Sequence, residues 1–528
     1  MNLAIKNVAK FGDTDVFPSP LDRYVCQDQP GKVLELLKNI DSSFDHFLEN
    51  QPPSNIDCLA QIGYTSFRWT TQLDPFWNLY FLSQVIQIAE KIEHKRIPTS
   101  ENTTYSYRWN PNVVTGHLFG PQNWRAYKDQ CLELSNNHSY VLVADVADFY
   151  ARAAHHRLDN ELDRLEENAT TVKRLKILIS KFSETRSYGL PVGGPASRIL
   201  AELCMVPIDL YLDRKGIKFC RYVDDFHIFS ESEDEAHRHL AFLSQVLFNE
   251  GLSLQRSKTR ILETKELRAT SSHLSEHAED PGVNQSDQKQ LMRLSLRYDP
   301  YSLTAEQDYE ALKEVVASID VVGILMREIS KTNIDSQITK QAILAIQALE
   351  PESRDEAVCS LMTPANLSIL CPVFVNVMKL IRSIYEDLSS QAQNHVQSCL
   401  VSIVQDRHHI LENDLNLTYF LKAFRYHKSR EKEMIVIELF EHRRSPLVRK
   451  EIILILADWK STYWLSNQRT SFSSMNKWER KAFIIASFTT GDEGHHWFKH
   501  TKRTFSKSEK LVAEWFDARR TTNPSIPV

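Results

Sequence analysis

Arg221-Tyr222-Val223-Asp224-Asp225-Phe226 places two adjacent carboxylates between two short apolar runs. The flanking runs, 217–220 and 226–229, are rich in β-branched and aromatic residues, so both are predicted to be strands with the Asp pair at a hairpin turn. Two carboxylates about 4 Å apart repel by roughly 1 kcal/mol in water and about 4 kcal/mol at an effective dielectric of 20. A divalent cation removes this repulsion, and oxygen ligands suit Mg²⁺. A solvated Asp-Asp turn is the alternative.

Further motifs stand in a fixed order around this hairpin. The apolar run 140–144 ends in Asp145, and the loop Gly189-Leu190-Pro191-Val192-Gly193-Gly194-Pro195-Ala196-Ser197-Arg198 opens an apolar helix. Lys258 follows the hairpin after a predicted helix, which spans 232–249, and a strand. This order resembles the palm of a reverse transcriptase, and the Gly-Leu-Pro-x-Gly-x-x-x-Ser loop together with Tyr-Val-Asp-Asp is a specific combination.

The resemblance implies a catalytic centre. The palm sheet would bring Asp145 and Asp224 to one edge. Nucleotidyl transfer uses two metal ions about 4 Å apart, here expected to be Mg²⁺, with Mn²⁺ as an alternative. The implied metal ligands are Asp145, Asp224 and the Val146 carbonyl, with Asp225 beside them. Lys258 takes the place of a lysine that protonates the leaving pyrophosphate, a general-acid role.

The resemblance also implies a nucleotide site. Tyr150 stands five residues after Asp145, where an aromatic ring under the sugar would select dNTPs over rNTPs; a core aromatic is the alternative. Gly193 lies in the loop expected to touch the nucleotide. Arg108 falls in a predicted fingers hairpin formed by 96–99 and 105–109, where it is expected to meet the triphosphate. An exposed strand arginine is equally compatible with that position.

Composition sets limits on the class of protein. The chain has 528 residues, 42% hydrophobic and 25% charged, which suits two or three domains of a soluble protein. Its net charge of −5 is unusual for a protein that grips long duplex nucleic acid. The eight cysteines include no C-x-x-C pair and are expected to be buried free thiols. No apolar run of transmembrane length and no signal-peptide core is present, so a cytoplasmic protein without a membrane contact is expected.

The second half of the chain differs from the first. After residue 282 only three glycines occur, which indicates helices with short connections. Together with the resemblance to reverse transcriptases, this implies an α+β fold: a right-hand polymerase fingers and palm domain over 1–268, a linker over 269–290, and an all-α HEAT-like repeat domain over 291–528. An ordinary helical bundle is the alternative for the last part. The predicted helices there are 305–318, 335–349, 365–388, 392–404, 415–424, 431–441, 446–459 and 477–488.

One position narrows the resemblance. Templated reverse transcriptases usually carry Gln after the Pro of the Gly-Leu-Pro loop, and this chain has Val192. That form, with a helical second half, resembles the abortive-infection (Abi) reverse transcriptases of bacteria and prophages, AbiK-like polymerases. This resemblance implies phage defence by polymerising dNTPs without a template, with the single-stranded DNA product attached to a tyrosine, in a homo-oligomer such as a trimer or hexamer. Tyr24 is the first candidate for priming, followed by Tyr426 and Tyr463.

Two other functions stay open. A templated reverse transcriptase of a retron-like or other defence system would need a bound RNA. A non-enzymatic scaffold with a polymerase fold would be expected to have lost its acids, whereas Asp145, Asp224 and Asp225 are all present.

Overall fold

The computed structural model describes all residues except 19–20, 166–168, 274–315, 317–318, 524 and 527–528. They form two compact units. The palm unit comprises Leu79–Ile319, and the helical unit comprises Met1–Asn78 together with Asp320–Val528. The boundary between them falls inside helix α5 (Pro75–Lys95).

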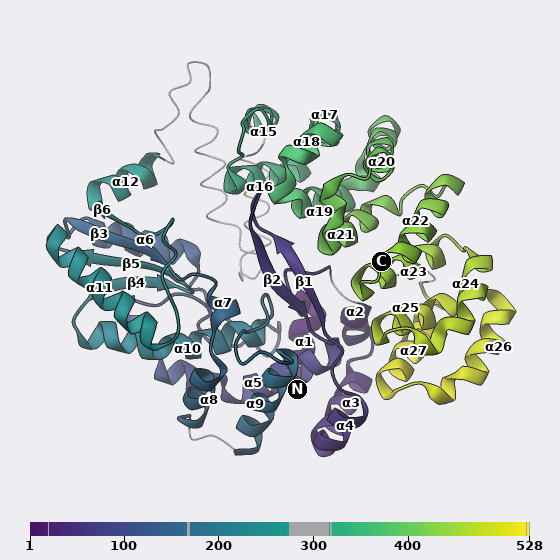
Figure 1. Ribbon diagram of the computed structural model, residues 1–528, viewed down its shortest axis with the longest axis horizontal. Coiled ribbons are helices and arrows are strands. Elements are labelled where there is room, and N and C mark those ends of the chain that lie inside the picture. The colour runs from purple at the N-terminus through teal and green to yellow at the C-terminus, as the bar shows by residue number, and fades with distance from the viewer. Residues whose placement is uncertain (19–20, 166–168, 274–315, 317–318, 524, 527–528) are drawn as a thin grey trace. The chain divides into compact units, whose positions relative to one another are not determined.

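The palm unit is built around a four-stranded antiparallel sheet in the order β4-β5-β3-β6 (Figure 1). A turn at Val223 and Asp224 joins the two strands of the hairpin, as the sequence predicts. The sheet consists of β3 (Tyr140–Asp145), β4 (Lys218–Tyr222), β5 (Asp225–Ser230) and β6 (Arg260–Glu263).

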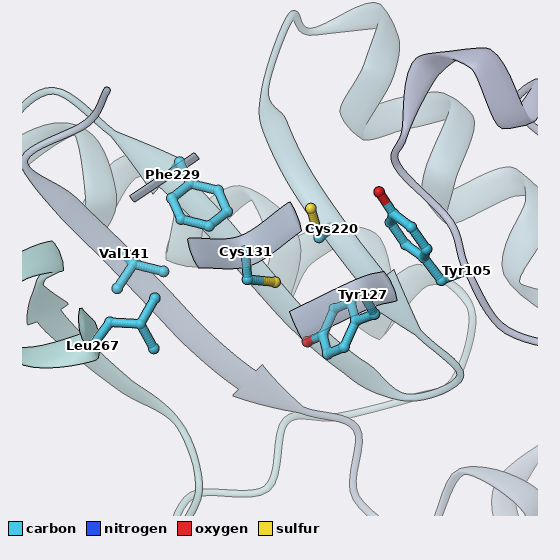
Figure 2. Packing of buried hydrophobic residues seen from close by; sticks show 7 residues of the cluster. All are labelled: Tyr105, Tyr127, Cys131, Val141, Cys220, Phe229 and Leu267. Carbon is cyan, nitrogen blue, oxygen red and sulfur yellow. The ribbon is translucent and has the colours of Figure 1, made fainter. Parts of the chain in front are cut away.

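Helices cover both faces of this sheet. On one face lie α6 (Trp124–Ser135) and α12 (Thr264–His273), and on the other α10 (Pro195–Arg214) and α11 (Glu233–Asn249). Figure 2 shows the cluster under α6, where side chains from α6, α12 and three strands meet. It contains Tyr105, Tyr127, Cys131, Val141, Cys220, Phe229 and Leu267. All eight cysteines are free, as predicted, with six buried and two partly buried.

The helix starts follow the capping signals of the sequence. Asp74 Oδ1 accepts hydrogen bonds from the backbone N–H groups of Phe76 and Trp77 at the start of α5. Ser232 Oγ likewise accepts a hydrogen bond from the backbone N–H of Glu235 at the start of α11. The first turn of α11 carries three acids. Such caps satisfy N–H groups that have no partner within the helix.

The predicted fingers hairpin over 96–109 is wrong. Thr99–Glu101 forms a 3₁₀ turn (η1), and Asn102 and Tyr107 take positive φ angles of 49° and 46°. Thr104 instead forms a parallel bridge with Arg221, while Trp109 pairs with Phe119. The edge of β4 therefore takes the hydrogen bonds that a local hairpin would have used.

The helical unit contains a curved row of helices (Figure 1). Six of them pack in sequence, each on the next: α16 (Ser336–Ala345), α19 (Phe374–Ile384), α21 (Asp414–Phe424), α23 (Pro446–Asp458), α25 (Lys477–Ser487) and α27 (Lys507–Arg519). The others are α15 (Val321–Ile329), α17 (Pro351–Leu361), α18 (Pro364–Ile369), α20 (Ser390–Gln405), α22 (Arg430–His442), α24 (Thr462–Gln468) and α26 (Gly491–Thr501). A largely helical second half is thus confirmed, and its HEAT-like character stays a prediction. The predicted helix at 305–318 lies almost wholly outside the described residues.

The first 78 residues pack with the C-terminal helices. Asp22 forms a buried ion pair with Lys481 at 3.1 Å, and Asp28 accepts a hydrogen bond from Trp515. The elements of this segment are α1 (Asn2–Phe11), α2 (Leu21–Asp28), α3 (Pro30–Ser42), α4 (Phe44–Asn50), β1 (Ile56–Gln61) and β2 (Phe67–Gln72).

Residues 1–78 pack with the C-terminal helices through contacts more than 400 positions apart in the sequence, and such contacts leave no local pattern. Residues 269–273, predicted as linker, continue α12, and the rest of that linker lies outside the described residues. As functional boundaries, the three predicted domains stay a prediction. In the part of the chain described, no helix is long and apolar enough to cross a bilayer.

Candidate active site

The sheet register brings the three predicted catalytic acids together. Asp145, the last residue of β3, is paired directly with Asp225, the first residue of β5. One residue further, the backbone N–H of Val146 donates to the carbonyl of Asp224 at 3.1 Å. Asp145 and Asp224, which are 79 positions apart in the sequence, therefore lie at the same end of the two central strands of the palm sheet.

Lys258 also belongs to this site. Its Nζ donates to Asp145 Oδ2 at 2.8 Å, while its side chain remains 63% exposed. Burial alone would lower the pKa of Lys258, but the hydrogen bond and the three nearby carboxylates raise it above its usual value. The backbone N–H of Gln255 donates to the Asp145 carbonyl at 2.7 Å and thereby fixes the loop that carries the lysine.

The carboxylates repel one another. Burial, and then the neighbouring Asp224 and Asp145, raise the pKa of Asp225 to about 7. Among the described residues, no three carboxylate, imidazole or thiol side chains converge as a ready-made metal cage. Mg²⁺ is usually held by only one or two carboxylates together with water and substrate phosphates. The carboxylates of Asp145 and Asp224, which both lie near enough to Asp225 to raise its pKa, are a donor set that fits such an ion.

Tyr150 lies close to these acids. It sits in the short helix α7 (Phe149–Arg152), and its carbonyl accepts a hydrogen bond from Leu190 N of the Gly-Leu-Pro loop at 2.7 Å. Burial raises the pKa of the Tyr150 phenol, and Tyr107 and Arg198 are among its charged or ionisable neighbours. Asp224 is also among these neighbours, and a sugar-contacting residue must lie near the catalytic acids. That role stays a prediction.

The glycine loop approaches α7 closely. Gly189 has a φ of 99° and its N–H donates to the carbonyl of Ala153 at 2.8 Å. Gly193 also has a φ of 99°, and Gly194 directly precedes the first residue of α10. Positive φ angles are readily adopted by glycine and poorly by other residues. The contact predicted between Gly193 and the nucleotide is not tested by this geometry.

Arg108 does not take the position predicted for it. Its guanidinium is buried, forms an ion pair with Glu93, and donates to the Ile97 carbonyl at 3.0 Å and to Thr104 Oγ1 at 2.7 Å. These internal bonds occupy the side chain and oppose a role in binding the triphosphate. Arg198, at the start of α10, is also buried, and its guanidinium lies 5.0 Å from the centre of the Tyr107 ring.

A buried network beneath the hairpin turn was missed by the sequence reasoning. Arg221 is fully buried and donates to Asp209 Oδ1 at 2.7 Å, Glu202 Oε2 at 2.9 Å and the carbonyl of Val223 at 2.8 Å. Ser106 joins it from another segment. An arginine between the apolar Cys220 and the aromatic Tyr222 was the available signal, because such a charge is rarely buried without partners.

The three candidate priming tyrosines all belong to the helical unit. Tyr463 is 83% exposed. Tyr426 stacks on Tyr385 with ring centres 4.1 Å apart, and Tyr24 lies under the guanidinium of Arg519. Tyr463 is therefore the most exposed residue of the three.

Comparison with known proteins agrees with the palm geometry. Residues 82–287 match the family model described as "Reverse transcriptase (RNA-dependent DNA polymerase)". The chain therefore contains a reverse transcriptase domain, which implies nucleotidyltransferase activity and binding of nucleotides and nucleic acid. Domains of this kind generally use divalent metal ions, typically Mg²⁺. No curated protein matches the chain.

Solved structures similar to this chain include two telomerases. The apo telomerase of Candida tropicalis is 12% identical, with 71% of this chain and 70% of that chain covered and a TM-score of 0.31. The telomerase of Candida albicans in complex with a TWJ fragment of telomeric RNA is 12% identical, with 86% and 70% covered and a TM-score of 0.30. Nothing about activity follows from similarity at this level.

Proposed function

We propose that this chain is a DNA polymerase that adds dNTPs by nucleotidyl transfer at Asp145, Asp224 and Asp225. The observation that carries the proposal is the pairing of Asp145 with Asp225 across β3 and β5, with Asp224 in the adjoining turn. This arrangement gathers carboxylates where charge must be neutralised, and the match of residues 82–287 supports the same reaction.

The residues of the site have distinct tasks in this reaction. Asp145 and Asp224, with the Val146 carbonyl, would hold two Mg²⁺ ions, or Mn²⁺ in their place, and Asp225 lies beside them. When bound there, the ions lower the pKa of the attacking hydroxyl and neutralise the triphosphate. The primer oxygen forms a bond to the α-phosphorus, and the bond to pyrophosphate breaks. Lys258, held beside Asp145, can donate a proton to that leaving group.

We further propose that the enzyme serves in a bacterial abortive-infection system, without a template, and primes synthesis from its own tyrosine. The support is Val192 in place of the glutamine of templated enzymes, the net charge of −5, and the large helical part of the chain. The product would be single-stranded DNA attached to the protein, made by a homo-oligomer. A templated reaction is the second candidate, favoured by the description of the matched family as RNA-dependent.

Two parallel incubations, one without and one with an added template–primer, test both versions of the proposal. In the first, purified protein is given Mg²⁺ and labelled dNTPs, without primer or template. We expect label that runs with the denatured protein, shifts it upward, survives boiling in detergent and disappears with DNase. Incorporation only with an added template–primer, with none retained on the protein, would support the templated version instead. No incorporation under either condition would refute the proposed activity.

A further inference from the structure

The turn that carries Asp224 is held in a strained conformation. Val223, the residue before Asp224, has a φ of 55° and is buried. A β-branched residue at positive φ is a real outlier, and such conformations persist only where surrounding contacts enforce them. The strain is located one residue away from a predicted metal ligand, so the contacts that enforce it bear on the chemistry.

Two side chains hold Val223 from opposite sides of its backbone. The N–H of Val223 donates to Ser106 Oγ at 2.9 Å, and its carbonyl accepts from Arg221 Nη1 at 2.8 Å. Both polar groups of the strained residue are therefore satisfied by buried side chains, since Ser106 and Arg221 are each 0% exposed.

Ser106 reaches the turn because its segment runs along β4. Arg221 N donates to the Thr103 carbonyl at 2.8 Å, and Tyr105 N donates to the Arg221 carbonyl at 3.0 Å. This parallel pairing ends at Tyr105, one residue before Ser106. It places the Ser106 hydroxyl next to Val223, although the two residues are 117 positions apart in the sequence.

Charged partners fix the two clamping groups. Asp209 and Glu202 bind the guanidinium of Arg221, and Glu202 also accepts a hydrogen bond from the Ser106 hydroxyl and pairs with Arg96 at 2.8 Å. Although burial opposes its charge, Asp209 and Glu202 raise the pKa of Arg221, so the cation persists. The hydroxyl hydrogen of Ser106 points to Glu202, which leaves its oxygen to accept from Val223.

We infer that Ser106 and Arg221 are positioning residues that hold Val223 in its left-handed conformation and thereby fix the Asp224 carboxylate for metal binding opposite Asp145. This inference rests on the proposed function of the site. Neither residue contacts the reacting atoms. They act through the backbone of Val223, and glycine at that position should make them dispensable, because glycine adopts positive φ without strain.

A double-mutant cycle tests this coupling. The four proteins are the wild type, Ser106→Ala, Val223→Gly and the double variant. For each we measure the dNTP incorporation rate against Mg²⁺ concentration, Mn²⁺ affinity by electron paramagnetic resonance without nucleotide, and the Tm. Ser83→Ala is the matched control, because Ser83 is equally buried in the palm unit but donates only to the Tyr80 carbonyl of its own helix.

In the wild-type background, Ser106→Ala should weaken Mn²⁺ affinity and raise the Mg²⁺ requirement on the order of tenfold, the scale of one released strained residue. In the Val223→Gly background, Ser106→Ala should weaken Mn²⁺ affinity by less than about threefold. Ser106→Ala should lower the Tm in both backgrounds. Equal losses of metal affinity in both backgrounds, or a similar loss in Ser83→Ala, would overturn the inference. A wild type that binds Mn²⁺ but incorporates no dNTP would instead refute the proposed function, and the affinity cycle would still decide the positioning role.

Discussion

At the scale of single residues, the palm unit combines acids that repel each other with a lysine that partly neutralises them. Burial and the neighbouring acids raise the pKa of Asp225 to about 7, which disfavours its charge. The hydrogen bond to Asp145 and the nearby acids raise the pKa of Lys258, which favours its charge. Burial, and to a smaller extent the neighbouring Asp224, raise the pKa of the Tyr150 phenol on α7. Each side chain is placed by backbone bonds of the sheet or loop, so single substitutions should separate their tasks.

Tyr150→Ala should admit ribonucleotides. The smaller side chain leaves room for a 2′-hydroxyl, so the preference for dNTPs over rNTPs should fall on the order of tenfold or more. The ratio of kcat/KM for the two nucleotide classes measures this. Tyr211→Ala, at a half-exposed position of α10, is the control and should leave the ratio unchanged. An unchanged ratio in Tyr150→Ala would mean that this ring only fills the core.

Asp13 gives a pH prediction in the helical unit. It is 2% exposed, and burial raises its pKa to about 6, although Gln72 and Asn78 donate to its Oδ2. Because the folded pKa lies above the unfolded value, the protonated form favours folding, and this contribution is lost as pH rises from about 4 through 6. Ionisation of this buried carboxyl above pH 6 therefore costs the folded state about 3 kcal/mol.

Asp13→Asn should therefore raise the Tm at pH 7.5 and leave it nearly unchanged at pH 4.5, because an amide oxygen still accepts from Gln72 and Asn78. Thermal unfolding at both pH values measures the effect. A variant that is less stable than the wild type at pH 7.5 would contradict the prediction that the ionised Asp13 carboxylate destabilises the folded protein.

At the scale of elements, the loop before α10 determines where α7 lies. Gly189 N bonds to the Ala153 carbonyl, and the next residue bonds to the Tyr150 carbonyl. A Cβ on Gly189 would meet the Ala151 carbonyl oxygen at 3.5 Å, an ordinary contact, so its φ of 99° is the reason for glycine. The loop and α7 are therefore bonded together through the backbone.

Gly189→Ala should lower the unfolding free energy by about 1–2 kcal/mol and raise the KM for dNTPs. The strained residue would relax by moving the loop, and Tyr150 would move with it. Gly31→Ala is the control, since Gly31 is exposed in α3 and a Cβ there meets no atom within 4 Å. A KM for dNTPs equal to the wild-type value in Gly189→Ala would show that the position of this loop does not affect nucleotide binding.

The elements also show how far the sequence could predict the fold. The strands around Asp224 and the helices that begin after Asp74 and Ser232 were predictable, because period, turn and capping signals are local. The segment over 99–107 was not, because its backbone bonds go to β4, more than a hundred positions away. Arg108 was misplaced for a different reason: its partners Glu93 and Ile97 are close in sequence, but a hairpin over this segment would have left the side chain exposed rather than folded back onto them.

At the scale of the whole chain, the helical unit joins both ends of the sequence. Buried ion pairs mark this unit, including Lys422 with Glu451 at 3.0 Å and Asp22 with Lys481 at 3.1 Å. The unit also carries every tyrosine proposed to prime synthesis. Self-priming is therefore a hypothesis that concerns both units of the chain.

If synthesis starts on a tyrosine, one phenylalanine substitution should remove protein-bound label. We expect this from one of Tyr24→Phe, Tyr426→Phe or Tyr463→Phe, while incorporation on an added template–primer persists at roughly the wild-type rate. Mass spectrometry after nuclease digestion identifies the modified residue independently. Label that remains in all three variants and maps to no tyrosine would contradict priming by the protein.

The most direct measurement of the central claim compares dNTP incorporation by the wild type and Asp224→Asn, with and without an added template–primer. Asp213→Asn, at an exposed position of α10, is the matched control. The account predicts that Asp224→Asn loses at least about a hundredfold in rate under every condition, with its Tm unchanged, because a metal ligand at the reacting phosphate is removed. Wild-type incorporation by Asp224→Asn would contradict the assignment of the active site to this hairpin.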